Sequence, residues 1–161
     1  MATHEIDLVI SDAPVPVELS VQAYNHLMGE SNLVVFGSKA ISKEAKSSFP
    51  DCLGQMPVFM PTRNTMLRRE IDRWLDSCGI RPNIRAEFED SALKKVFAQN
   101  EDALIFLPSV VEEEVVRSLG LDVVARVPEL VERIYLISLE RRIKNPFASL
   151  VISSAKEMVF N

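Results

Sequence analysis

The stretch FMPTRNTMLRREIDRWLDSCG, residues 59–79, decides the fold. Its apolar start belongs to a short strand, and its second half repeats apolar residues at the spacing of an amphipathic helix. We expect this helix to run from near Thr65 to Cys78 and to stop at Gly79, which readily adopts left-handed backbone. The spacing predicts an inward face and a solvent face, formed respectively by Leu67, Ile71, Trp74, Leu75 and Cys78, and by Arg68, Arg69, Asp72, Arg73 and Asp76.

Strands and helices alternate from this stretch to the end of the chain, which indicates an α/β fold with a parallel or mixed sheet covered by helices. A helix opened by Asp90-Ser91 should point Leu93, Val96 and Phe97 inward. A helix with a capping box at 109–112 should end at Gly120. The further strands are expected at 6–10, 33–36, 84–88, 103–107, 121–125 and 134–139, with a last helix from Asn145-Pro146.

Two segments before residue 57 carry weaker patterns. Residues 15–27 read as a crossing segment whose second half is a strand. Residues 37–50 are rich in serine and lysine, and we expect a mobile polar loop there.

Composition narrows the class of protein. The 161 residues suit one domain, or one and a fraction of a second, and 18 basic against 23 acidic residues give a net charge of −5 without a basic cluster. Such a chain should not bind DNA unaided. Cys52 and Cys78 lack metal-binding spacing and are expected as free thiols. We find no signal peptide or membrane span and expect a cytoplasmic protein.

Four polar residues follow the strand at the start of the predicted helix: Thr62, Arg63, Asn64 and Thr65. Ligands of open α/β sheets lie beyond the carboxyl ends of strands, where a helix N-terminus attracts anions. These residues could hold a small anionic or polar ligand, or Thr62 or Asn64 could simply cap the helix while Arg63 points into water. Ser11-Asp12 and Pro108-Ser109 follow other strands and occupy equivalent places.

Catalytic, cofactor and metal signals are missing from the sequence. Neither a phosphate-binding P-loop nor a GxGxxG motif occurs, and no nucleophile, base and orienting group stand together, so we predict a protein that is not an enzyme and needs no cofactor or metal. Asp12, Glu87, Glu89 and Asp90 offer hard oxygens, but their spacing is not that of an ion-binding loop. Solvated charges and a helix cap are the favoured interpretation.

Five segments together resemble the effector-binding domain of LysR-type transcriptional regulators. They are DLVISDAP, PTRNTMLRREIDRWLDSCGI, AEFEDSALKKVFAQ, PSVVEEE and ERRIKNPF, spread over nearly the whole chain. Within that family the resemblance is to the group of activators of the sodium/proton antiporter gene. It implies a periplasmic-binding-protein-like (type II) fold of two α/β subdomains joined by crossing strands, with the effector in the cleft between them.

Carried onto these residues, the resemblance implies a complete second subdomain at about 20–140 and a remnant of the first at 4–14 and 145–161. Family members are about twice as long, so we expect an N-terminally truncated form that lacks the DNA-binding helix-turn-helix. The effector site would take Ser11, Asp12, Thr62, Arg63, Asn64, Thr65 and Pro108.

The resulting hypothesis is a ligand-sensing regulatory domain that responds to sodium or alkaline stress. It would bind a small-molecule or ion effector, form a homodimer or larger oligomer, and act on DNA only through the helix-turn-helix outside these residues. Two alternatives remain open. One is a solute-binding module, and the other is a small α/β enzyme that binds an anionic substrate at the Thr62 helix start.

Overall fold

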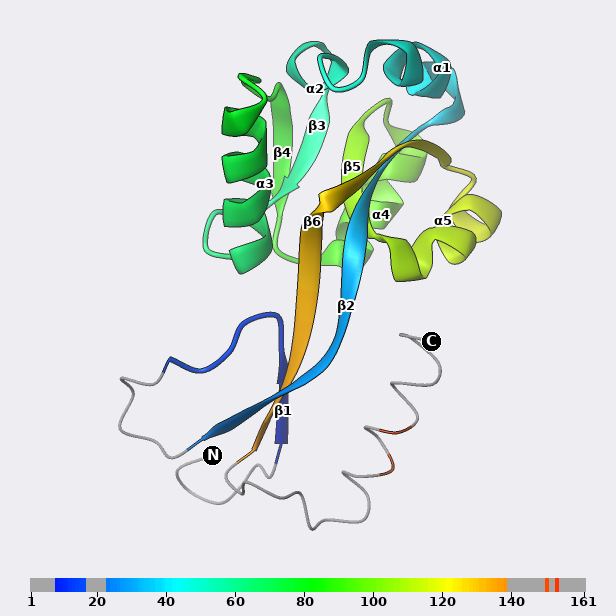
Figure 1. Ribbon diagram of the computed structural model, residues 1–161. Helices are drawn as coiled ribbons and strands as arrows, with labels where there is room; N and C mark the ends of the chain where they lie inside the picture. Colours follow the sequence, from blue (N-terminus) through cyan, green and yellow to red (C-terminus); the bar gives the residue numbers. More distant parts are fainter. Residues whose placement is uncertain (1–7, 17–22, 139–149, 151–152, 154–161) are drawn as a thin grey trace. The chain divides into compact units, whose positions relative to one another are not determined.

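The computed structural model describes residues 8–16, 23–138, 150 and 153 (Figure 1). The chain divides into two compact units, one formed by Met1–Ser31 with Glu132–Asn161 and the other by Asn32–Val131. The described strands are ordered β1-β6-β2-β5-β3-β4 in one sheet. Each unit is described by itself below.

The unit of residues 32–131 contains the parallel part of the sheet. β3 lies between β4 and β5 and is parallel to both, while β2 is antiparallel to β5. Its strands are β2 (Tyr24–Gly37), β3 (Val58–Pro61), β4 (Ile84–Phe88), β5 (Leu104–Pro108) and β6 (Asp122–Ser138), the first and last of which continue into the other unit. Its helices are α1 (Lys39–Ser48), α2 (Cys52–Gln55), α3 (Met66–Ser77), α4 (Ser91–Asn100), η1 (Ser109–Val111) and α5 (Glu112–Leu119).

Helices cover both faces of this sheet, as the alternation of elements predicted. The first apolar cluster contains Leu104 and Phe106 of β5 together with residues of α1, α2 and α3. The second contains Ile105 and Leu107 of the same strand together with residues of α4 and α5. Because successive side chains of a strand point to opposite faces, β5 is buried on both sides.

The helix predicted from residues 59–79 is confirmed. α3 begins after the N-cap Thr65, buries Ile71 and Leu75, and is followed by Gly79 at φ 71°. Gly120 ends α5 in the same left-handed conformation, at φ 65°. Cys78 departs from its predicted inward place and is exposed, because it is the C-cap residue where the helix turns away from the core.

The prediction of a loop at 37–50 is wrong. Residues Lys39–Ser48 form α1, which packs Ile41 and Ala45 against the core. The buried Ser42 hydroxyl donates to the Asp122 carboxylate at 2.7 Å, so a polar side chain serves as part of the inward face. The inward face of α1 has few apolar residues, and serines and lysines surround them. The sequence therefore lacked the apolar periodicity from which a helix is predicted.

Several predicted strands are parts of longer ones. The strand at 33–36 is the end of the continuous β2, and the strands at 121–125 and 134–139 belong to the single β6 as far as Ser138, its last described residue. Both strands have a partly exposed face along part of their length, and polar residues occupy it. These polar residues interrupt the apolar pattern, so each strand was predicted as a shorter one.

The inward face of α4 is also different from the prediction. Asp90 caps the helix as expected, through a 2.7 Å bond from the Ala92 N–H. However, Lys94 and Ala98 are buried, whereas Leu93, Val96 and Phe97 are 49%, 52% and 46% exposed. The helix expected to open at Ser109 starts later, because residues 109–111 form a 3-10 turn and Val111 is the N-cap of α5.

In the other unit, β1 (Leu8–Ser11) pairs with the end of β6 in antiparallel register, Leu8 opposite Ser138 and Ser11 opposite Tyr135. The His26 ring nitrogen Nε2 lies 3.0 Å from the Ser138 hydroxyl. The helix predicted from Asn145 falls almost entirely outside the described residues. Both cysteines are free thiols, as predicted.

Candidate functional site

The carboxyl ends of three parallel strands meet at one edge of the second unit. β3 ends at Pro61, its neighbour β4 at Phe88 and its other neighbour β5 at Pro108. The segment Thr62–Thr65, called here the mouth loop, leaves β3 at this edge and leads into α3. The structure therefore brings the mouth loop and Pro108 to the same edge, which is where open α/β sheets bind ligands.

The mouth loop is ordered by its own side chains. The Thr62 hydroxyl donates to the Asn64 side-chain oxygen at 2.6 Å, and the Thr65 hydroxyl donates to the Thr62 carbonyl at 3.0 Å. The Arg68 N–H in turn donates to the Thr65 hydroxyl at 3.2 Å. Thr65 is therefore the cap of α3, a role that the sequence had left to Thr62 or Asn64.

Arg63 extends from the loop into solvent. Its side chain is 81% exposed, and its Nε atom lies 3.6 Å from a Glu87 carboxylate oxygen. An ion pair this exposed contributes little to stability. Breaking this ion pair would therefore cost little free energy if the Arg63 guanidinium turned toward an anion at the mouth of the sheet.

Arg68 lies beneath the mouth loop, and the prediction that it faces solvent is wrong. Its side chain is 3% exposed. It donates to the Pro61 carbonyl at 2.7 Å, to Glu87 at 2.8 Å and to both oxygens of Asp72 at 2.8 and 3.0 Å. A buried guanidinium needs such partners because its desolvation is costly. The Arg68 side chain thus joins the start of α3 to the ends of β3 and β4.

This ion cluster sets the protonation of its members. The hydrogen bond from Arg68, together with the charges of Arg68 and Arg63, holds the pKa of Glu87 below its usual range. Burial alone would lower the pKa of Arg68, but its hydrogen bonds to Glu87 and Asp72 outweigh burial and raise it. Arg68 and Glu87 are therefore both charged across the physiological pH range.

A second buried cation approaches the same edge from the other face of the sheet. Lys94 of α4 is 3% exposed, and its Nζ atom donates to the Phe106 carbonyl of β5 at 3.1 Å. Arg68 and Lys94 are the charged residues that are buried in the described part of the chain. Neither was predicted to be buried from the sequence.

Ser11 and Asp12 belong to the other unit. The Ser11 hydroxyl accepts a bond from the Ala13 N–H at 3.2 Å, which is the geometry of a local turn at the end of β1. Asp12 is exposed. The place of these two residues in an effector site stays a prediction, as does that of Thr62, Arg63, Asn64, Thr65 and Pro108.

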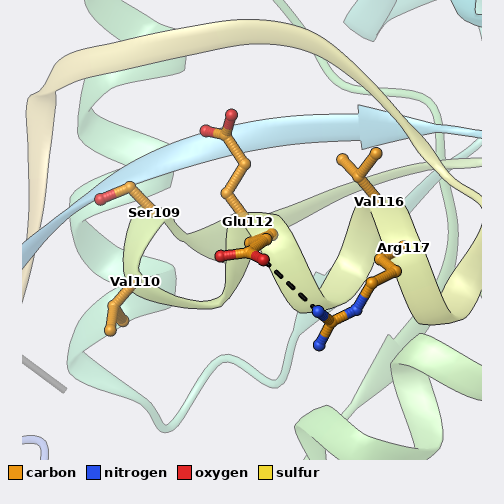
Figure 2. Close-up of a pocket in the computed structure, with 6 residues that line it drawn as sticks. Ser109, Val110, Glu112, Val116 and Arg117 are labelled. Carbon is orange, nitrogen blue, oxygen red and sulfur yellow. Dashed lines mark hydrogen bonds and ion pairs between the residues drawn. The ribbon is translucent and has the colours of Figure 1, made fainter. Parts of the chain in front are cut away.

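A hollow that sequence reasoning missed lies on η1 and α5, directly after Pro108 (Figure 2). Its volume is about 560 Å³, and it is open to solvent, since Val110 and Val116 are 38% and 43% exposed. Arg117 lines it (Figure 2), and its Nη1 atom lies 3.4 Å from a carboxylate oxygen of Glu113, one turn earlier in the same helix. In the sequence, the hollow is marked by the three glutamates that start α5. Their charges are explained by the favourable effect of acidic residues at a helix N-terminus, so they did not indicate a hollow.

Two of the four carboxylates that were weighed as cation ligands, and assigned instead to solvated charges or a helix cap, have partners within the protein. Glu87 is paired with Arg68, and Asp90 caps α4. Within residues 8–16 and 23–138, no group of three or more histidine, cysteine, aspartate or glutamate side chains could hold a metal ion. Among the described residues, no helix is long and apolar enough to cross a membrane.

The family is decided by the match of the LysR substrate binding domain to residues 1–159. The chain belongs to this family. The transcriptional activator protein NhaR of Escherichia coli strain K12 is 24% identical over 161 residues, which is the whole of this chain and 52% of that protein. The chain therefore spans about half the length of the curated relatives it matches.

Solved structures of transcriptional regulators and regulatory domains share the fold of this LysR domain. The probable transcriptional regulator PA0477 of Pseudomonas aeruginosa superimposes with a TM-score of 0.71 at 17% identity, over 99% of this chain and 52% of that one. The Synechocystis CcmR regulatory domain, solved with 2-PG, gives a TM-score of 0.67 at 16% identity over 100% and 77%. The predicted periplasmic-binding-protein-like (type II) α/β fold is confirmed.

The Glu87–Arg68 pair predicts a pH-dependent stability. A carboxylate whose pKa is lowered by folding stabilises the native state above its unfolded pKa of about 4.3, and this contribution is lost as pH falls through the native pKa. Glu87→Gln should therefore lower the thermal midpoint by a few degrees at pH 7. The difference from the native chain should shrink below about pH 4.

Glu89→Gln is the matched control, because it removes one exposed carboxylate just beyond the same strand. It should leave the midpoint close to that of the native chain at both pH values. A Glu87→Gln midpoint that follows the native chain at pH 7 would contradict the assigned role of the ion cluster around the buried Arg68.

Proposed function

We propose that this chain is the ligand-sensing part of a NhaR-like transcriptional activator that controls sodium/proton antiporter expression in response to sodium or alkaline stress. The carrying observation is that the LysR substrate-binding domain match and the resemblance to NhaR both extend over essentially the whole chain. We assign residues of about 20–140, which include the compact unit of residues 32–131, to the second subdomain, and residues 4–14 and 145–161 to a part of the first. DNA would be contacted by a part of the protein outside these residues, in the cytoplasm.

We propose that the effector contacts the mouth loop, with Pro108 on the same edge and with Ser11 and Asp12 from the other unit. The mouth loop suits this role because its shape is fixed by its own hydrogen bonds and by Arg68, so little ordering is needed on binding. Arg63 supplies an exposed cation at the mouth. An effector that binds one closure state of the two subdomains better than the other would shift their equilibrium, and the oligomer would transmit that shift to DNA.

The chemistry of the mouth favours sensing over catalysis. Two carboxylates near it, Glu87 and Asp72, are both bound to the buried Arg68. Using either as a general base would take a charged partner away from the buried Arg68 guanidinium, which is unfavourable. This supports the regulatory role over the small α/β enzyme that the sequence left open.

We further propose that the regulator self-associates through α4. Leu93, Val96 and Phe97 form an exposed apolar surface on this helix, while its buried side is held by Lys94 and Ala98. Exposed apolar surface of this kind marks an interaction site, and a second copy is the occupant that fits a family acting as oligomers on DNA.

The sodium response is tested with the full-length regulator and a reporter driven by the host's sodium/proton antiporter promoter. Sodium chloride should induce the reporter, and potassium chloride at the same ionic strength should not. Arg63→Ala should reduce the induction at least several-fold, because it removes the exposed cation of the mouth.

Arg69→Ala is the matched control for this measurement, since Arg69 is an exposed arginine on the helix that follows the mouth loop. It should retain the full induction. Equal reporter output in the two salts would contradict the proposed sodium response. Equal loss of induction in the Arg63→Ala and Arg69→Ala variants would show that the mouth loop has no specific role in that response.

Self-association is tested by light scattering on the purified chain. Leu93→Glu and Val96→Glu should each lower the average mass at a given concentration, because a charge would be buried in the contact. Val116→Glu, at a comparably exposed valine on α5, should leave the mass unchanged. An unchanged mass in the α4 variants would show that this surface is not the contact.

A further inference from the structure

The ladder between β3 and β5 ends early for a chemical reason. The Leu104 N–H donates to the Pro57 carbonyl at 2.8 Å, and the two strands remain paired as far as Phe59 opposite Ile105. In a parallel ladder the next bond in this series would run from the N–H of residue 61 to the carbonyl of Phe106. Residue 61 is proline, which has no N–H.

The Phe106 carbonyl would therefore be a buried acceptor without its ladder donor, which is costly. Lys94 supplies the donor. Its side chain is buried, and its ammonium reaches this carbonyl from α4 at a distance of 3.1 Å. Residue 61 is also the last of β3, so this bond lies directly beside the start of the mouth loop.

We propose that Lys94 is a positioning residue for the mouth loop. Its ammonium replaces the N–H that Pro61 lacks, and so it stabilises the point where β3 and β5 separate and the loop begins. This role rests on the proposed function, in which the mouth loop contacts the effector. Lys94 acts through the backbone and does not itself touch the effector.

Lys94→Met and Pro61→Ala together test this inference in the purified chain. Lys94→Met keeps a long apolar side chain but removes the donor, so it should lower the thermal midpoint and move the amide resonances of Thr62–Thr65. Pro61→Ala supplies the missing N–H. It should not raise the midpoint in the native background, where the Phe106 carbonyl already has its donor, but should raise it in the Lys94→Met background.

The double variant separates positioning from simple stability. The new backbone N–H at position 61 should be protected from hydrogen exchange, because the ladder then continues by one bond, and the Thr62–Thr65 resonances should stay away from their native positions. In the full-length regulator, this variant should remain folded yet lose most of the sodium induction. If Lys94 only satisfied a buried acceptor, the double variant would regain the native resonances and the induction together.

Lys95→Met, at the neighbouring lysine, is the control and should leave the midpoint and the mouth-loop resonances unchanged. The inference is overturned if Lys94→Met behaves like Lys95→Met, or if Pro61→Ala gives no recovery in the Lys94→Met background. Should Lys94→Met fail to fold, folding of the double variant supports the inference and its failure to fold overturns it. A native regulator without sodium response would refute the proposed function, while the ligand-free resonances would still decide the role of Lys94.

Discussion

Pro61 imposes the constraint on which the candidate site depends. It ends β3, the strand between β4 and β5, and it cannot donate a hydrogen bond to either neighbour. Its own carbonyl is bound by the Arg68 guanidinium, and the Phe106 carbonyl opposite it is bound by the Lys94 ammonium. The charged residues buried in the described part of the chain thus lie at a single junction, where the sheet ends and the mouth loop starts.

The two cations come from helices on opposite faces of the sheet. α3 packs in the first apolar cluster and α4 in the second, so the junction is held from both sides. Arg68 is balanced by Glu87 and Asp72, which makes its burial tolerable. Against this fixed junction, the Arg63 side chain is 81% exposed and makes one long ion pair, to Glu87 at 3.6 Å.

The parts of this arrangement that sequence could predict are local. α3 follows from apolar spacing and its end from Gly79, both within a single segment, whereas its cap proved to be Thr65 and not Thr62 or Asn64. The burial of Arg68 depends on Glu87 of another strand, and the role of Lys94 depends on the register between β3 and β5. The spacing of residues within a helix shows neither the Glu87 carboxylate nor the Phe106 carbonyl. Arg68 was therefore assigned to the solvent face, and Lys94 was not predicted to be buried. α4 shows the same difficulty, because counting apolar residues selected the face that is exposed.

The most direct measurement of the Pro61 junction is an NMR experiment on the native chain that detects the Lys94 side-chain nitrogen and its coupling across a hydrogen bond. We predict that the Lys94 Nζ protons exchange slowly with water and show a scalar coupling to the Phe106 carbonyl carbon. Rapid exchange without such a coupling would contradict the proposed role of Lys94, because its ammonium would then not be the donor to the Phe106 carbonyl.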